Sequence, residues 1–180
     1  MRRNLRSFDS LQRALLAESL TLIKDSRDEE NHMAKATTFI VVKCGNTKTH
    51  HAAKEIEKVI KSKGFAWFAK YGSKINFEKI DLTDQNRNYV LCLSLFLDNR
   101  YEIFSYQIEE FGAKTTPLKG TYPSYYQENF QFINTWVKIS EYKGASPSVN
   151  DLIIKSSLNR LAETLKKSTS GHFICRLLRE

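Results

Sequence analysis

The chain has 180 residues, of which 41% are hydrophobic and 27% are charged. This composition is near the average of soluble globular domains and excludes the disordered and fibrous classes. Lysine and arginine total 28 against 20 acidic residues, and the net charge of +8 permits a polyanionic partner without requiring one. No apolar run approaches the roughly 20 residues that span a bilayer, so the sequence predicts no transmembrane helix and no membrane partner.

The three cysteines, Cys44, Cys92 and Cys175, are odd in number, widely spaced and flanked by apolar residues. A chain of this length buries roughly 70% of its unfolded surface and needs no disulfide to be stable. We therefore expect buried, reduced thiols in a reducing compartment, which is cytoplasmic, or nuclear if the cell is eukaryotic. His50 and His51 are adjacent and would project about 100° apart on a helix, so their spacing predicts no metal site.

Residues 1–36 differ in character from the rest of the chain. Apolar residues recur there at helical spacing, which predicts an amphipathic helix over residues 7–24. The polar segment 25–32 follows as a linker, and a separate domain is predicted over residues 37–180. Two interpretations of the helix remain open: it packs on the domain, or it mediates assembly with a second copy or a partner protein.

Strand and helix patterns follow one another in the first half of the domain. β-branched and aromatic runs predict strands, and apolar positions at helical spacing predict a helix that ends at Gly64. The predicted elements are a strand over 37–44, a turn at 45–46, a helix over 50–63, strands over 65–70 and 88–97, a turn at 98–100 and a strand over 101–111.

The second half of the domain begins with a segment rich in proline and tyrosine. Its predicted elements are an aromatic loop over 115–129, a strand over 130–141, a helical stretch after Pro147, a second helix over 158–165 and a final strand over 172–178. Asn150 is the predicted cap of the helical stretch, in which Leu152 and Ile153 pack.

Most of the predicted strands are consecutive, with one helix near the front and a helical pair before the last strand. This order is not that of a doubly wound βαβ sheet. It predicts an α+β fold built on a small, mostly antiparallel, curled β-barrel with flanking helices and the N-terminal helical arm. Curling would remove the exposed edges of the sheet.

The turn after the first predicted strand is a candidate phosphate site, because backbone N–H groups and hydroxyls at a helix start hold phosphate. The candidate residues after Gly45 are Asn46, Thr47, Lys48 and Thr49. The Gly-Asn-Thr sequence resembles the phosphate loop of flavodoxins, whereas a turn with a helix cap explains it equally well. The chain has no P-loop, dinucleotide, GxSxG or HExxH motif, which favours a non-enzymatic role.

Aromatic side chains stand beside lysines at several points of the sequence. Trp67 and Tyr71 lie close to Lys70 and Lys74. Base stacking on an exposed ring contributes about 1–3 kcal/mol, and lysines neutralise phosphates, so these two lysines and Lys43 are further candidate phosphate contacts. The alternative is that the rings form the core and the lysines cover its rim.

The order of elements over residues 37–180 resembles the PUA-like superfamily, and within it the EVE and YTH branches. The likeness rests on this layout, on the WVKI strand at 136–139, on the YPSYY loop at 122–126 and on the SGHF start of the last strand at 170–173. Members of the superfamily bind RNA or DNA, and the EVE and YTH branches hold one flipped, often methylated, base in an aromatic pocket.

The resemblance implies a base pocket in this chain. Trp67 and Tyr71 would form its wall, Ser94 would read the edge of the base, and Tyr125 or Tyr126 would serve as a lid.

Three functions remain open at this point. The first, which the sequence favours, is a nucleic-acid-binding domain that accommodates a modified or flipped base of RNA or DNA and needs no cofactor. The second is a small flavin- or nucleotide-binding enzyme that uses the turn at 45–49. The third is an interaction module that assembles through residues 7–24.

Overall fold

The computed structural model describes residues 36–44, 51–71, 75, 80–112 and 117–178. The chain divides into two compact units, Met1–Lys35 and Ala36–Glu180, and all described residues belong to the second. The predicted helix over 7–24, the candidate phosphate turn at 45–49 and Lys74 lie outside the described residues.

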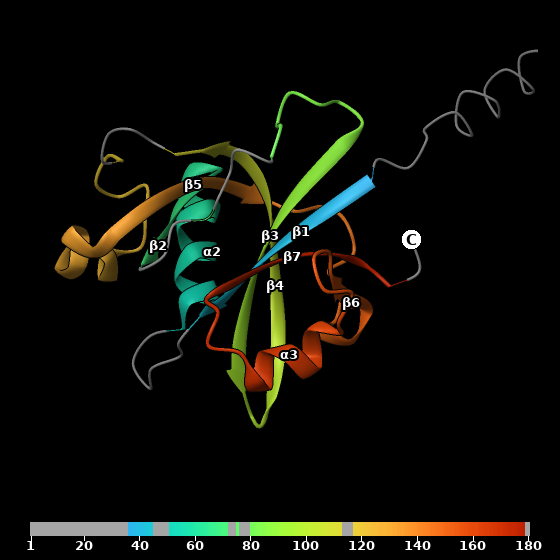
Figure 1. Cartoon of the computed structure of the whole chain (residues 1–180). Helices are drawn as coiled ribbons and strands as arrows, with labels where there is room; N and C mark the ends of the chain where they lie inside the picture. The colour runs from blue at the N-terminus through green and yellow to red at the C-terminus, as the bar shows by residue number, and fades with distance from the viewer. Residues whose placement is uncertain (1–35, 45–50, 72–74, 76–79, 113–116, 179–180) are drawn as a thin grey trace, which may run out of the picture. The chain divides into compact units, whose positions relative to one another are not determined.

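In the part of the chain that the structure describes, seven strands form one sheet, with two α-helices and two 3₁₀ helices (Figure 1). The elements are β1 (Ala36–Cys44), α2 (Ala52–Lys63), β2 (Ala66–Tyr71), β3 (Arg87–Leu97), β4 (Arg100–Phe111), η1 (Ser124–Phe132), β5 (Ile133–Glu141), η2 (Val149–Asp151), β6 (Leu152–Ile154), α3 (Leu161–Lys167) and β7 (His172–Leu177). Neither α-helix is long and apolar enough to cross a membrane.

The sheet is mixed and open, so the predicted closed, mostly antiparallel barrel is wrong. The strand order is β2-β5-β4-β3-β1-β7-β6, in which β1 runs parallel to β3 and the other neighbouring pairs are antiparallel. The outer strands β2 and β6 do not pair with each other among the described residues. Closure would require these two edges to hydrogen-bond, and β6 has only three residues to offer.

The parallel pair of β1 and β3 explains this arrangement. After β1, the chain passes through α2 and places β2 beside β5 at the far edge, and only then does β3 return next to β1. Parallel neighbours need such a long connection, which a hairpin cannot provide. Register shifts between Lys70 and Tyr71 and between Ile108 and Glu110 mark irregularities of the bulge type, which bend and twist strands. The sheet therefore curls without closing.

The central strands β1 and β3 are buried on both faces. Ile40 and Leu91 face one hydrophobic core, which α2 covers, and Phe39 and Val90 face a second core, to which α3 contributes. None of these four side chains is more than 2% exposed. The sequence of a strand that is covered on both faces is a nearly continuous apolar run, and the sequences of β1 and β3 have this pattern.

Helix α2 and its end are confirmed. The helix starts at His51, whose Nδ1 accepts a hydrogen bond from the Lys54 N–H at 3.3 Å. It ends at Gly64, which has a φ of 80° and donates its N–H to the Ile60 carbonyl at 2.7 Å. The left-handed conformation favours glycine, which explains why the residue marks the helix end in the sequence.

The predicted helical stretch around Asn150 is wrong. The residues form the single 3₁₀ turn η2, whose cap is Ser148, and Leu152 already begins strand β6. Leu152, Ile153 and Ile154 are 0%, 6% and 6% exposed where they pair with β7, and the two isoleucines favour a strand. The second predicted helix exists but begins at Leu161.

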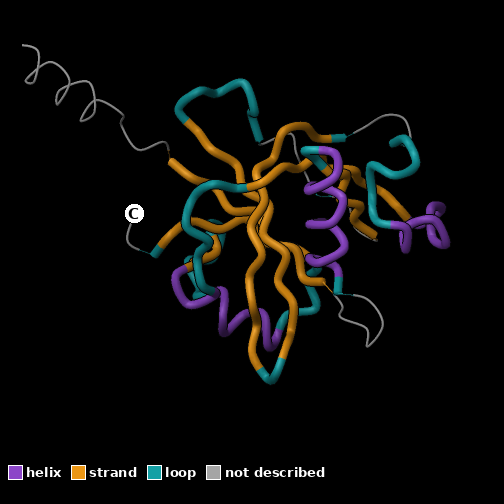
Figure 2. The backbone as a smooth tube through the Cα atoms, turned by 180° about the vertical axis from the view of Figure 1, so that it is seen from behind, coloured by secondary structure: helices purple, strands orange, loops and turns teal. Residues whose placement is uncertain are grey.

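The predicted hairpin is confirmed by β3 and β4. Asp98 and Asn99 connect the strands with φ values of 46° and 65°, as a type I′ turn requires. Figure 2 shows the two strands running together to this turn, which lies at the opposite end of β3 from the loop that precedes the strand. The two ends of β3 therefore belong to different surfaces of the domain.

Candidate nucleic-acid interface

The structure brings together three of the five residues predicted to form a base pocket. The ring centroids of Tyr71 and Tyr126 are 5.8 Å apart, and those of Tyr125 and Tyr126 are 4.5 Å apart. Trp67 is half-buried against the core on strand β2. Ser94 is on β3 with 0% exposure, and the alternation of the strand turns it to the face that α3 covers, away from the tyrosines.

The tyrosines belong to an interlocked aromatic cluster between η1 and strands β2 and β5. Tyr126 contacts Trp136 with centroids 5.7 Å apart, and Trp136 also meets Tyr122 at 5.5 Å and Phe130 at 5.8 Å. Tyr126 is 2% exposed, and burial raises its pKa well above the usual value. Tyr71 is 37% exposed, so it is the ring of the predicted set most open to solvent among those described here.

Two of the lysines predicted to contact phosphate have internal partners. Lys43 donates from Nζ to the carbonyl of Leu165 at 2.9 Å and to that of Ser168 at 3.1 Å, at the C-terminal end of α3. Lys70 is 6% exposed and donates to the Tyr71 carbonyl at 3.0 Å, and burial lowers its pKa. Both ammonium groups therefore serve the fold of this domain, Lys43 at a helix end where a cation is favourable.

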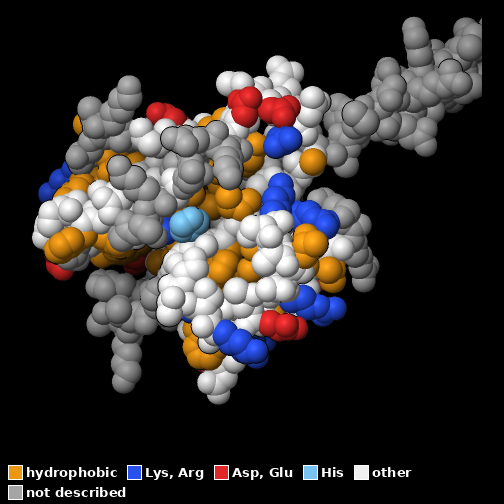
Figure 3. Space-filling view, viewed as in Figure 1, with side chains coloured by type: hydrophobic (Ala, Val, Ile, Leu, Met, Phe, Trp, Pro, Cys, Tyr) orange, Lys and Arg blue, Asp and Glu red, His pale blue; other side chains and the backbone are white. Residues whose placement is uncertain are grey.

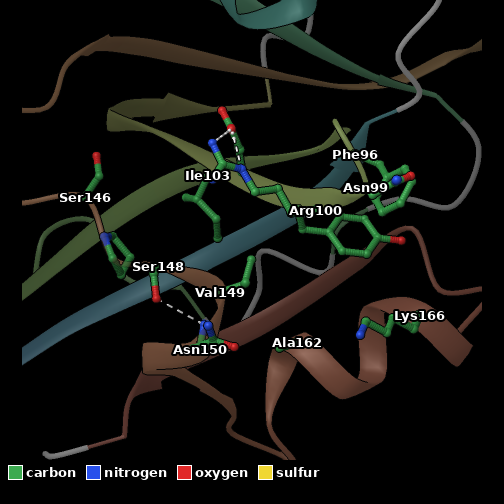
Figure 4. Close-up of a pocket in the computed structure, with 13 residues that line it drawn as sticks. Phe96, Asn99, Arg100, Ile103, Ser146, Ser148, Val149, Asn150, Ala162 and Lys166 are labelled. Carbon is green, nitrogen blue, oxygen red and sulfur yellow. Dashed lines mark hydrogen bonds and ion pairs between the residues drawn. The ribbon is translucent and has the colours of Figure 1, made fainter.

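An exposed aromatic side chain beside cations is found elsewhere, at the turn end of the β3–β4 hairpin. A groove of about 690 Å³ lies there between the hairpin, the segment 146–150 and α3. We call it the hairpin groove; its lining includes Phe96, Asn99, Arg100, Tyr101, Glu102, Ser148, Asn150 and Lys166. Figure 4 shows Phe96 and Asn99 on one side, Ala162 and Lys166 of α3 on another, and Ser146 to Asn150 on a third.

Phe96 is the aromatic platform of the hairpin groove. Its side chain is 51% exposed, whereas Leu95 before it is fully buried. The Phe96 ring packs on that of Tyr101 across the hairpin, with centroids 5.0 Å apart and an interplanar angle of 57°. An exposed ring with a fixed neighbour offers one face to a planar ligand.

The charged side chains that line the hairpin groove include one more cation than anions. Arg100 contacts Glu102 Oε1 through Nε at 3.0 Å and Nη2 at 2.8 Å, so these two charges offset each other. Glu102 is the only acid among the described residues that line the groove, and Lys166 adds a positive charge from α3. Both partners of the Arg100 pair are partly exposed, and such pairs contribute little to stability. An incoming phosphate therefore meets two cations and one acid.

The wall of the hairpin groove is held by hydrogen bonds to the end of α3. The Leu165 carbonyl accepts from the Tyr101 hydroxyl at 3.2 Å and from Lys43 Nζ. Ser148 Oγ accepts from the Asn150 N–H at 3.2 Å and orders the third side. Asn99 and Asn150 add amide groups that both donate and accept, which is the chemistry that reads the edge of a base.

No protein-family model, curated protein or solved structure matches the chain.

Sequence reasoning missed Phe96 because it stands within a long apolar run that predicts a buried strand. Two local signals could have identified it. Phe96 lies two residues before the Asp98-Asn99 turn, where a strand commonly leaves the core. The chain after this turn continues with a cation and an aromatic residue, Arg100 and Tyr101. Arg100, Tyr101 and Lys166 become a single site only when α3 packs beside the hairpin.

Proposed function

We propose that the protein binds single-stranded RNA or DNA, with a base stacked on Phe96 and the adjoining phosphates beside Lys166 and Arg100. The observation that carries the proposal is the half-exposed Phe96 ring, packed on Tyr101 inside a groove that also presents cations. Stacking on an aromatic ring and neutralisation of phosphate are the two main terms of single-strand binding. The net charge of +8 favours the same partner at longer range.

A modified base fits this proposal. A methyl group on the base adds apolar surface to the contact with Phe96 and Tyr101. Asn99 and Asn150 are amides on the groove wall and supply donors and acceptors for the polar edge of the base. We further propose a reducing compartment, cytoplasmic or nuclear, because Cys44, Cys92 and Cys175 are free thiols.

A base pocket formed by Trp67, Tyr71, Tyr125 and Tyr126 stays a prediction, without Ser94, which faces the other side of the sheet. The resemblance to the PUA-like superfamily stays a prediction too. The proposal made here does not depend on either. The two locations give different expectations for mutation, so one experiment compares them directly.

The test is a fluorescence-anisotropy titration of labelled single-stranded and duplex oligonucleotides of RNA and DNA, each with and without base methylation. Phe96→Ala should weaken single-strand binding about 5- to 150-fold, which corresponds to the loss of one stacked base. Lys166→Gln should lower the slope of log affinity against log salt by about one phosphate contact. Phe132→Ala is the matched control, because this ring is 59% exposed and lies outside the groove.

Three outcomes decide the proposal. Loss of affinity for Phe96→Ala with unchanged Phe132→Ala supports it. Loss for Trp67→Ala with unchanged Phe96→Ala rejects the hairpin groove in favour of the predicted pocket. Absence of binding to every oligonucleotide at low salt overturns the function itself.

A further inference from the structure

A second pocket of about 590 Å³ lies at the other end of β3, away from the hairpin groove. It is bounded by the starts of β1, β3 and β7 and by the residues that follow β6. We call it the β1–β7 pocket; its lining includes Thr38, Arg87, Tyr89, Lys155, Ser170 and His172. Tyr89 and Phe96 are seven positions apart on β3, roughly 23 Å, so the two sites are separate.

Strand register sets three of these side chains on one face of the sheet. Thr38 on β1 is the register partner of Tyr89 on β3, and Val42 on β1 is the partner of His172 on β7. Side chains at alternate positions of β1 point to the same face, and four positions along a strand span roughly 13 Å. The pocket therefore has two ends, one at Thr38 and Tyr89 and the other at His172.

Each end contains a buried polar atom with no hydrogen-bond partner in the structure. The Tyr89 side chain is 4% exposed, and its hydroxyl is fully enclosed and unpaired. His172 Nδ1 is likewise enclosed and unpaired. Buried polar groups are nearly always hydrogen-bonded, and an unpaired one costs folding free energy. Two such atoms in one pocket indicate a polar ligand that pairs with them.

The end at Thr38 and Tyr89 holds two cationic side chains, Lys155 and Arg87. Lys155 donates from Nζ to Thr38 Oγ1 at 2.7 Å, which holds the ammonium group at the pocket wall. Arg87 also lines this end and contacts Asp84 through Nε at 3.2 Å. Among the described residues that line the pocket, none is acidic. In Figure 3, most lysine and arginine side chains of this view lie on its right half with one acidic side chain among them, and the acidic side chains at the top lie beside another basic one.

We propose that the β1–β7 pocket binds the phosphate monoester of a nucleoside. The phosphate lies at the end formed by Arg87, Tyr89 and Lys155, beside the two cations, and binding brings the enclosed Tyr89 hydroxyl into position to donate one hydrogen bond to it. The sugar and base extend toward Ser170 and His172, and His172 Nδ1 pairs with a polar atom of the base. The volume lies within the roughly 300–1,000 Å³ of small-molecule sites, and apolar and aromatic residues also line the pocket, as a nucleoside requires.

The same chemistry occurs in a free nucleotide and at the 5′ end of a strand. Calorimetric titration of the full chain with each of the four nucleoside 5′-monophosphates, with the matching nucleosides and with inorganic phosphate defines the ligand class. Titration with 5′-phosphorylated and 5′-hydroxyl oligonucleotides then distinguishes the two sources. At least one nucleotide should bind about tenfold or more tightly than either its nucleoside or inorganic phosphate.

Two substitutions test the position of the phosphate. Tyr89→Phe removes only the unpaired hydroxyl, and Lys155→Gln removes the charge and keeps a donor for Thr38; each should weaken nucleotide binding about tenfold. Lys143→Gln is the matched control, because Lys143 is exposed and lies outside both pockets. Phe96→Ala should leave nucleotide affinity unchanged, so a failure of this proposal is distinguishable from a failure of the hairpin groove.

Each titration either supports or overturns the proposed nucleotide site. Saturable nucleotide binding that both Tyr89→Phe and Lys155→Gln weaken supports the proposal, and preference for a 5′-phosphorylated strand over the free nucleotide assigns the ligand to a strand end. Equal affinity for inorganic phosphate refutes the nucleoside. No binding of any monophosphate, or binding unchanged in both variants, overturns the site.

Discussion

The unpaired hydroxyl of Tyr89 makes a prediction about stability that can be checked without any ligand. Tyr89→Phe deletes one oxygen from a side chain that is 4% exposed and leaves the ring packed in its core. A buried hydroxyl without a partner costs roughly 1–3 kcal/mol of folding free energy. We expect the variant to be more stable than the natural protein by about 1–2 kcal/mol, which for a domain of this size raises Tm by roughly 2–8 °C.

The assay is urea and thermal unfolding of the full chain, followed by circular dichroism, with no nucleotide present. Tyr106→Phe is the matched control, because Tyr106 is also 4% exposed but donates its hydroxyl to the Ala53 carbonyl at 3.4 Å. This variant should lose about 0.5–1.5 kcal/mol. Ser94→Ala, which removes another buried and unpaired hydroxyl that lines neither pocket, should be neutral or stabilising.

The test is which of the two tyrosine variants is the more stable. If Tyr89→Phe is as destabilising as Tyr106→Phe, the Tyr89 hydroxyl has a protein partner in solution, and the argument for a ligand at this atom is refuted. A bound nucleotide should reduce the stability advantage of Tyr89→Phe over the natural protein, because a tenfold weaker affinity gives the variant up to about 1.4 kcal/mol less stabilisation at saturating ligand. Unfolding with and without nucleoside monophosphate measures this reduction.

Three further predictions concern the fold. Gly64→Ala should lower stability by about 1 kcal/mol in urea unfolding, because the φ of 80° strains an alanine although a Cβ there would meet no atom within 4 Å. Lys43→Met removes the donors to the end of α3 and should cost about 1–3 kcal/mol, with faster amide exchange at Leu165; unchanged exchange would contradict this role. Burial raises the pKa of Cys92 and Cys175 to about 12, so iodoacetamide at pH 8 should alkylate these thiols only after unfolding, as mass spectrometry would detect.

Most of the helices and strands were predicted from local sequence signals. Helix α2 follows from its apolar stripe and Gly64, and the β3–β4 hairpin follows from two long runs joined by Asp98 and Asn99. Prediction failed at β6, because three apolar residues are compatible with a helical turn or a strand. The partner that decides between them is β7, which lies some twenty residues further along the chain.

The candidate site was harder to predict than the elements. Trp67 and Tyr71 stand beside lysines in the sequence, yet Lys70 turns inward and donates to a backbone carbonyl. Phe96 stands in an apolar run, yet it is half-exposed. Sequence proximity does not say which face of a strand meets solvent, because that depends on what packs against each face.

In the part of the chain that the structure describes, composition and periodicity alone determined the strands, the amphipathic helix α2 and the buried thiols of Cys92 and Cys175, whereas Cys44 is only partly buried. These features depend on residue type and spacing. Tertiary structure alone decided that β1 pairs with β3 in parallel and that the sheet stays open. It also decided that Thr38, Tyr89, Lys155 and His172, from four separate segments, line one pocket. Which strands pair depends on burying both faces of each strand at the same time. A periodic pattern in the sequence indicates which residues are buried, but it does not indicate which strand or helix packs against them.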